Sequence, residues 1–193
     1  MAVQSLTASS TLLVGEARWM LLPIPKVAST LLKRLAVIAD GREPFEGAAF
    51  GETKPALAIH QAQNHGLQTL SQLSEADQES WTNDPHALRL AVTRHPGERL
   101  LSFWHDKLHL ADPAYAPLNG SVQAARRKDQ SEPCRFSDFL SYLSDHWELL
   151  QSDGHLMPQH RFIGQSNLFN LRLDRHQLVK ELPKKLKSLL FSF

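Results

Sequence analysis

A lysine, a serine and a threonine stand together in residues 25–30, directly after a short apolar run and directly before a helical pattern. The first residues of a helix have free backbone N–H groups and a partial positive charge, so an anion is stabilised there. The amides of residues 27–30 and the hydroxyls of Ser29 and Thr30 could donate to an oxyanion, and Lys26 would add a full positive charge. The alternative is an ordinary helix cap with a surface lysine. The glycine-rich Walker A pattern is absent, which disfavours an ordinary kinase or GTPase.

An arginine and another hydroxyl stand eight residues apart in the stretch TRHPGERLLSFWHDKL. Arg94 ends an apolar run that reads as a strand, and Ser102 lies on the helix that follows. An arginine at the carboxyl edge of a parallel sheet lies where α/β folds bind their ligands, provided that this helix begins at the proline after the strand. Arginine and hydroxyl together suit a phosphate group. The alternative makes Arg94 and Arg99 surface ion-pair partners of Glu98 or Asp106.

Strand and helix patterns surround the first of these stretches. The apolar run 18–24 predicts a buried strand. The next helix is expected to begin with Ser29 or Thr30 as its cap and to end at Asp40-Gly41. Its expected apolar positions are Leu31, Leu32, Leu35 and Ile38.

The same alternation continues along the chain. Residues 55–63 predict a second strand, and the leucine spacing in 67–82 predicts a helix. Residues 87–96 form the clearest strand pattern, and a proline can begin the helix after it. The apolar face of that helix is expected to hold Leu100, Leu101, Trp104 and Leu108. Residues 111–135 predict a long loop, and residues 136–143 predict another helix. The pattern favours an α/β domain with a mainly parallel sheet.

The composition is that of an ordinary globular chain. It has 193 residues, 42% hydrophobic and 21% charged, with a formal net charge of +1. This balance gives no global attraction to nucleic acid or membrane, so anion binding must come from a local cluster. Cys134 is the only cysteine, which excludes an internal disulfide and fits a reducing compartment.

Taken together, the two stretches resemble the PAPS-dependent sulfotransferases, in particular the carbohydrate branch that includes chondroitin and heparan enzymes. In that family a strand leads into a P-K-x-x-x-[ST] loop, which here reads PKVAST (25–30). A later R-x-P-x-x-R-x-x-S-x-[WY]-x-x-K pattern reads RHPGERLLSFWHDK (94–107), and every fixed position fits. The segment HLMPQ (155–159) is similar to an H-x-x-P-[QI] segment of chondroitin-type members. The motifs follow the family's order over residues 18–165.

The resemblance implies a three-layer, P-loop-NTPase-like α/β fold with a mainly parallel central sheet flanked by helices. It also implies PAPS (3′-phosphoadenosine 5′-phosphosulfate) as co-substrate and no metal. Lys26 would stabilise the leaving phosphate, Ser29 and Thr30 would hold the 5′-phosphate, and Arg94 and Ser102 would anchor the 3′-phosphate. The residues implied for the donor site are Pro25, Lys26, Val27, Ala28, Ser29, Thr30, Arg94 and Ser102.

The acceptor hydroxyl needs a general base, and histidine suits this role near neutral pH. Heparan 2-O-type members of the family use a histidine just after the second strand, and AIHQAQNHG is the corresponding region. His65 is the first candidate and His60 the second. His155 is the third, either as the base or as a ligand of the transferring sulfuryl group. Each of these histidines could instead be a packing or surface residue.

Two further features have a weaker chemical interpretation. His105 and His109 are four residues apart on a predicted helix, but no H-E-x-x-H pattern accompanies them, so a zinc site is disfavoured. The basic run 126–128 could hold an acidic glycan, or it could be a solvated charged surface.

We therefore expect a single sulfotransferase-like domain over residues 1–193. Residues 166–193 match the family poorly, so we expect an incomplete C-terminus. The expected partner is a glycan or another hydroxyl-bearing acceptor, with no nucleic acid and no membrane span; the expected location is cytoplasmic. The alternative function is a catalytically degenerate family member that binds a nucleotide or an acidic partner without transfer.

Overall fold

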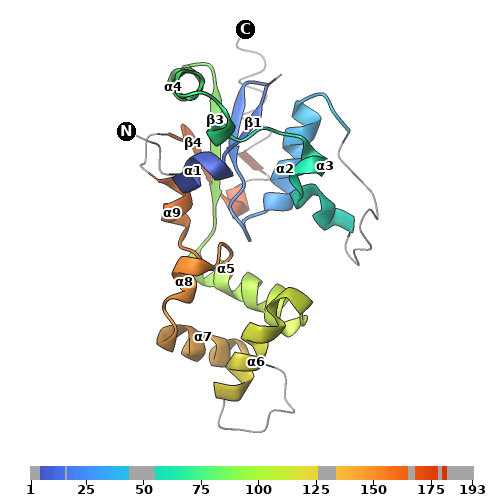
Figure 1. Ribbon diagram of the computed structural model, residues 1–193, viewed down its shortest axis with the longest axis vertical. Helices are drawn as coiled ribbons and strands as arrows, with labels where there is room; N and C mark the ends of the chain where they lie inside the picture. Colours follow the sequence, from blue (N-terminus) through green and yellow to red (C-terminus); the bar gives the residue numbers. More distant parts are fainter. Residues whose placement is uncertain are drawn as a thin grey trace. The chain divides into compact units, whose positions relative to one another are not determined.

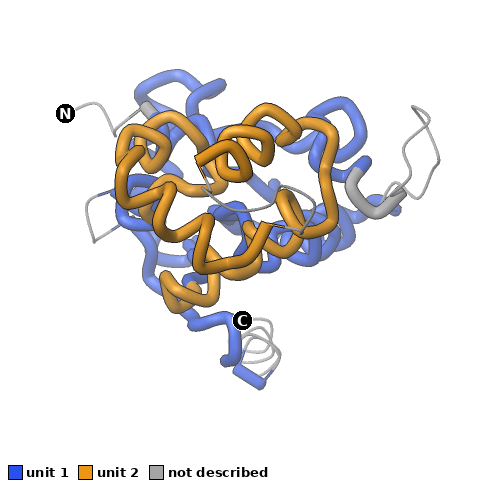
Figure 2. The backbone as a smooth tube through the Cα atoms, turned by 90° about the horizontal axis from the view of Figure 1, so that it is seen from below, with its two compact units in different colours: residues 1–93, 159–193 blue, residues 94–158 orange. Residues whose placement is uncertain are grey.

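The structure is a computed structural model in which the chain divides into two compact units, drawn in different colours in Figure 2. Unit 1 comprises residues 1–93 and 159–193, and unit 2 comprises residues 94–158. Within the described residues, unit 1 carries the sheet and unit 2 is built from helices. The described residues are 5–15, 17–43, 55–125, 134–164, 168–177 and 180–181.

Unit 1 is organised around a four-stranded sheet with the strand order β1-β2-β3-β4. Its strands are β1 (Leu12–Val14), β2 (Trp19–Leu22), β3 (Leu88–Thr93) and β4 (Leu171–Asp174). β1 runs antiparallel to β2, whereas β2, β3 and β4 are parallel. The strands predicted within 18–24 and 87–96 are confirmed, and the sheet is mainly parallel as expected.

Helices cover this sheet on both sides. Figure 1 shows α2 and α3 on one side of the strands and α1 and α9 on the other. The helices of unit 1 are α1 (Ser5–Ser10), α2 (Ser29–Ala39), α3 (Ala62–His65), α4 (Glu75–Asn83) and α9 (Gln159–Ile163). Unit 1 is therefore an α/β structure with a mostly parallel sheet flanked by helices.

The strand predicted for residues 55–63 is wrong. A 3₁₀-helix, η1 (Pro55–His60), occupies most of this range, and α3 follows it. The run is rich in alanine and glutamine and holds a single β-branched residue, so its intrinsic preference for a strand is weak. The Asn64 side chain also donates to the Ala58 carbonyl oxygen at 2.8 Å, which ties the two helical turns together.

The helix predicted for residues 67–82 begins later than expected. α4 begins at Glu75, because Ser74 caps it by accepting a hydrogen bond from the Asp77 amide. The preceding leucines pack instead around an isolated bridge between Leu12 and Thr69 and a short 3₁₀-helix, η2 (Leu70–Gln72). Their spacing of three reflects burial against the sheet rather than one continuous helix.

α2 packs on the sheet through a narrower face than predicted. Its buried residues are Leu32, Ala36 and Val37, whereas Leu31 and Ile38 are exposed. An apolar pocket of about 160 Å³ lies between this helix and the sheet. The lining comes from Trp19, Leu21, Leu32, Leu35, Ala36, Ile38, Ala39, Leu88 and Leu90.

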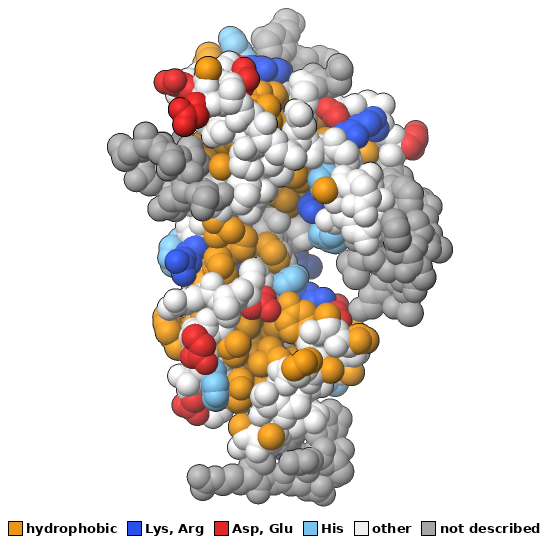
Figure 3. Space-filling model, in the orientation of Figure 1, with side chains coloured by type: hydrophobic (Ala, Val, Ile, Leu, Met, Phe, Trp, Pro, Cys, Tyr) orange, Lys and Arg blue, Asp and Glu red, His pale blue; other side chains and the backbone are white. Residues whose placement is uncertain are grey.

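Unit 2 is a helical unit with its own apolar core. Its elements are α5 (Pro96–Phe103), the π-helical stretch η3 (Trp104–His109), η4 (Pro113–Tyr115), α6 (Ala116–Ala125), α7 (Phe136–Asp145) and α8 (Leu149–Ser152). Phe103 and Phe139 are fully buried and stack with their ring centroids 5.5 Å apart. Figure 3 shows hydrophobic side chains on the visible face of this unit as well. The core residues are Phe103, Leu108, Val122, Cys134, Phe139, Leu143 and Leu156.

The helix beginning at Pro96 is confirmed, and so is the helix predicted at 136–143. The long loop predicted for residues 111–135 is wrong over its first half, where η4 and α6 lie. Asp112 explains part of this difference, because its carboxylate accepts from the Ala114 amide at 3.0 Å and so caps η4. The basic run 126–128 lies outside the described residues.

Candidate active site

The loop between β2 and α2 adopts a backbone conformation that glycine normally supplies. Lys26 has a φ of 65° and Ala28 a φ of 57°, both in the left-handed region. Ile24 and Val27 are fully buried, and the Val27 amide donates to the Ile24 carbonyl oxygen at 3.2 Å. These buried side chains hold the loop in place, which explains how it keeps this conformation without a glycine.

The start of α2 has no cap from its own cap residue. Ala28 occupies that position, and its methyl group cannot accept a hydrogen bond from the amides of the first turn. The prediction that Ser29 or Thr30 caps the helix is therefore wrong, because both residues already lie inside it. A left-handed residue directly before a helix turns successive N–H groups toward one point, which is the arrangement of an anion nest. The described loop is thus suited to a phosphate or sulfate group.

Two of the predicted site residues meet at this loop. The Thr30 hydroxyl lies 2.8 Å from Nε2 of His60, which is the last residue of η1. The first turn of α2 therefore has an imidazole directly beside one of its hydroxyls.

His65 lies in a different environment from His60. Its side chain is buried, and Nδ1 accepts a hydrogen bond from the Leu67 amide at 3.1 Å. Burial lowers the pKa of His65 to about 4, and the positive charges of Lys33 and Arg42 act in the same direction. Its described contacts are those of a neutral packing residue that holds the turn at Gly66.

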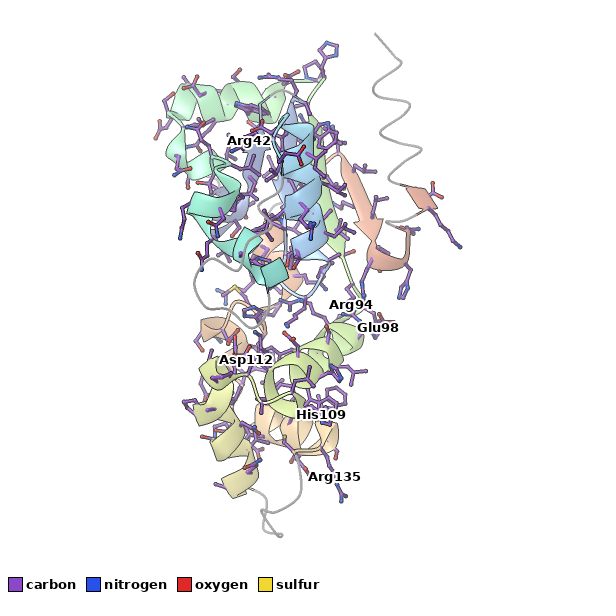
Figure 4. All side chains as sticks on the ribbon, turned by 90° about the vertical axis from the view of Figure 1, so that its right-hand side faces the viewer. Arg42, Arg94, Glu98, His109, Asp112 and Arg135 are labelled. Carbon is purple, nitrogen blue, oxygen red and sulfur yellow. The ribbon has the colours of Figure 1, made fainter. Side chains whose placement is uncertain are left out.

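Arg94 and Ser102 lie in unit 2: Arg94 is two residues before α5, and Ser102 is near the end of that helix. Arg94 is mostly buried, and its Nε donates to Glu98 Oε2 at 3.3 Å. Figure 4 shows these two side chains next to each other at the beginning of α5. Ser102 is four residues beyond Glu98, so it lies on the same face of the helix. The ion pair named as an alternative for Arg94 is present, which means that a phosphate would compete with Glu98 for the guanidinium.

His155 is held by two neighbouring polar side chains within unit 2. Its Nδ1 lies 2.9 Å from the Tyr115 hydroxyl and 3.5 Å from Asp153 Oδ1. The same Asp153 oxygen accepts a hydrogen bond from the backbone amide of His155 at 2.6 Å. The side chain of His155 is 38% exposed, so the ring is held at Nδ1 and is partly accessible to solvent.

A buried arginine, which the alternative in the sequence analysis placed at the surface, supports the turn that carries His155. Arg99 is only 3% exposed and donates to the carbonyl oxygens of Met157 at 2.8 Å and Gly154 at 3.2 Å. The alternative that made Arg99 a surface residue is therefore wrong. Burial lowers its pKa to about 10, against the opposing effect of Asp153, so Arg99 remains charged at neutral pH. Arg99, the second arginine of the motif at residues 94–107, thus donates to the backbone of the H-x-x-P-Q segment and of the residue before it.

A match to a known family covers almost the whole chain. The model described as the sulfotransferase family matches residues 12–190. The chain belongs to the sulfotransferase family. No curated protein and no solved structure matches it. The matched range runs from β1 beyond β4, so it includes both units and most of residues 166–193.

Membership in the sulfotransferase family supports a transferase function for this chain. Within the described part of the chain, no three histidine, cysteine or carboxylate side chains converge as ligands of a metal ion would. His105 and His109 stack on each other with ring centroids 5.5 Å apart, and Trp104 packs against His109. Among the helices of the described residues, none has both the length and the apolar composition needed to cross a membrane.

Proposed function

We propose that this sulfotransferase-family chain moves a sulfuryl group from PAPS to a hydroxyl acceptor, and that the acceptor is a carbohydrate. The observation that carries the proposal is the loop 25–30, whose left-handed residues lead into the start of α2, where the cap residue is an alanine, in a chain of this family. A motif typical of PAPS binding and a backbone suited to an anion thus coincide in the same six residues.

The free thiol of the buried Cys134 also supports a reducing compartment such as the cytoplasm.

The donor site is assigned by the chemistry of sulfuryl transfer. Negative charge develops on the leaving phosphate oxygen, and preorganised donors stabilise it most effectively. Lys26 would neutralise this charge, and the hydroxyls of Ser29 and Thr30 would hold the 5′-phosphate. The backbone of Pro25, Val27 and Ala28 would complete the cradle.

The 3′-phosphate is assigned to Arg94 and Ser102. Arg94 now pairs with Glu98, and a phosphate with two negative charges would be a stronger partner for the guanidinium than one carboxylate. Ser102, on the same face of α5, would add a hydroxyl donor.

We propose His155 as the general base, although the sequence favoured His65 and then His60. Burial disfavours His65 as the base, because an acceptor cannot easily reach its ring. Its Nδ1 also already accepts a hydrogen bond from the Leu67 amide. Nε2 of His60 is engaged by the Thr30 hydroxyl, which supports a role for His60 in holding the donor loop. His155 alone among the three combines a fixed Nδ1 edge with a partly exposed ring.

The test measures transfer of labelled sulfate from PAPS to a panel of hydroxyl-bearing glycans. We expect transfer by the wild-type chain and a loss of at least about 100-fold in Lys26→Ala, the range seen when one preorganised donor is removed. Lys180→Ala serves as the matched control, because Lys180 is an exposed lysine outside the loop. Equal rates in Lys26→Ala and Lys180→Ala would contradict the assignment of Lys26.

Binding is measured separately, by thermal stabilisation with PAP compared with ATP. A ligand at 100 times its Kd stabilises the folded state by about 2.7 kcal/mol, so PAP should raise Tm by several degrees and ATP should not. Stabilisation by PAP without transfer to any acceptor would favour a nucleotide-binding protein without catalysis. Equal stabilisation by ATP would contradict the donor assignment.

A further inference from the structure

His155, Tyr115 and Asp153 form a cluster in unit 2 that no sequence motif predicts as a whole. Tyr115 ends η4, forty residues before His155, yet its hydroxyl reaches Nδ1 of the imidazole at 2.9 Å. The Tyr115 ring packs edge-on against Phe103 with centroids 5.2 Å apart, which fixes the position of the hydroxyl. The cluster therefore combines a histidine with two groups that constrain its orientation.

Two contacts bear on which ring nitrogen carries the proton, and both are made by Nδ1. Burial acts to raise the pKa of Asp153, but hydrogen bonds from His155 and from the Tyr115 hydroxyl lower it overall, so this carboxyl is ionised and can only accept. Burial, and then the negative charge of Asp153, raise the pKa of Tyr115, which keeps its hydroxyl protonated. The Asp153 carboxylate lies 3.5 Å from Nδ1 and can only accept, which favours the hydrogen on Nδ1; the Tyr115 hydroxyl oxygen, 2.9 Å from the same nitrogen, then accepts from it as well. Nε2 is then the nitrogen with a free lone pair.

Asp153 is a charged group that lies against the imidazole, with Oδ1 at 3.5 Å from Nδ1. Lys107 of η3 lies 5.2 Å from the centre of the Tyr115 ring, but it is paired with Asp112 at 2.6 Å and with Asp106 at 3.6 Å. Arg99 of α5 is directed at the carbonyl oxygens of residues 154 and 157. The carboxylate of Asp153 can therefore stabilise a positive charge on His155.

We propose that Tyr115 and Asp153 are positioning residues that hold His155 with Nδ1 protonated, so that Nε2 accepts the proton of the acceptor hydroxyl. The inference rests on the proposed function. As the acceptor oxygen forms its bond to sulfur, its proton moves to Nε2 and the bond from sulfur to the phosphate oxygen breaks. The electron pair of that bond stays on the phosphate, and Asp153 stabilises the resulting imidazolium.

The first test measures kcat and KM for Tyr115→Phe, Asp153→Asn and His155→Gln. Tyr115→Phe keeps the ring that packs on Phe103 and removes only the hydroxyl, so it should fold. We expect His155→Gln to lower kcat by about 100-fold or more, the range of general base catalysis, with the KM for PAPS unchanged. Tyr115→Phe and Asp153→Asn should lower kcat by about 10-fold or more and move the acid limb of the pH profile.

A matched control comes from another tyrosine and histidine pair of the same unit. Tyr142 stacks on His146 with ring centroids 3.8 Å apart, outside the cluster. Tyr142→Phe and His146→Gln should leave kcat and the pH profile at wild-type values. An active wild type whose rate survives His155→Gln would overturn the inference while leaving the proposed function intact.

The second test needs no activity. Nitrogen-15 NMR of the ring of His155 in the full chain should show a protonated Nδ1 and an unprotonated Nε2 above its titration midpoint. Tyr115→Phe should shift this signal toward a mixture of tautomers, and Tyr142→Phe should not. A protonated Nε2 in the wild type would overturn the inference. Absence of transfer by a wild type with the expected NMR signal would instead count against the proposed function.

Discussion

At Lys26 and Ala28 the chain holds two non-glycine residues in the left-handed region. Such residues cost on the order of 1–3 kcal/mol each and persist only where the surroundings fix them. Here the surroundings are the buried side chains of Ile24 and Val27. The missing glycines therefore do not argue against an anion site, because packing supplies the conformation that a glycine would allow.

The buried His65 makes the free energy of unfolding depend on pH. Its pKa is about 4 in the folded chain and 6.5 in the unfolded chain, because burial and then Lys33 and Arg42 oppose its charge. Between these values the unfolded chain binds more protons, so the folded state loses stability as pH falls. We expect the free energy of unfolding in urea to fall by about 2 kcal/mol from this residue between pH 7 and pH 5.

The matched variant for this prediction is His65→Asn. Asparagine keeps an oxygen that can accept from the Leu67 amide, in place of Nδ1, and it does not titrate. The difference in unfolding free energy between pH 7 and pH 5 should be smaller in this variant than in the wild type. The same pH dependence in both chains would contradict the role given to His65.

At the scale of elements, the sequence predicts β2, β3 and α5 because several local signals agree there. Apolar runs define the two strands, and Pro96 marks the first position of the helix. For residues 55–65 the signals conflict, since an apolar run suggests a strand while alanine and glutamine favour a helix. Tertiary contacts such as that of Asn64 with Ala58 decide between them, and no local pattern contains those contacts.

The residues of the candidate site also differ in whether local sequence patterns could predict them. The loop 25–30 and the residues Arg94 and Ser102 were accessible from the sequence because each belongs to a contiguous motif. Tyr115 and Asp153 were not, since their meeting with His155 depends on how η4 and the turn after α8 fold. Arg99 carried a signal as a fixed motif position, but burial of its charge could not be read from the spacing.

Arg99 connects α5 to the turn that carries His155. Arg99→Met should destabilise unit 2 by about 3 kcal/mol, because two carbonyl oxygens would lose a charged donor. The stability of Arg99→Lys should lie between that of Arg99→Met and that of the wild type, since lysine keeps the charge but cannot donate to two carbonyl oxygens in the geometry of a guanidinium. The measurement is urea unfolding together with hydrogen exchange at residues 153–157.

Arg34→Met is a suitable control for this prediction, because Arg34 lies on α2 of unit 1, whereas residues 153–157 belong to unit 2. It should leave the exchange of residues 153–157 unchanged. Unfolding of Arg99→Met at the same urea concentration as the wild type would mean that these carbonyl contacts contribute little to the stability of unit 2.

At the scale of the whole molecule, the two units have separate cores, so their stabilities need not change together. Phe139→Ala should remove about 3–5 kcal/mol from unit 2, because Phe139 is fully buried and stacks on Phe103. We expect hydrogen-exchange protection to fall in residues 96–124 and 136–145, while β2 and β3 keep theirs. Equal loss of protection in β2 and β3 would mean that the units unfold as one.

The pairing of β3 with β4 has a consequence for how the chain is made. Leu90 pairs with Leu171, and the Arg89 amide donates to the Asn170 side chain across 81 positions of sequence. Synthesis therefore completes β3 and all of unit 2 before β4 leaves the ribosome. During that interval one edge of β3 has no strand beside it, and open edges recruit strands from other chains. We therefore expect the nascent chain to be prone to aggregation until β4 has paired with β3.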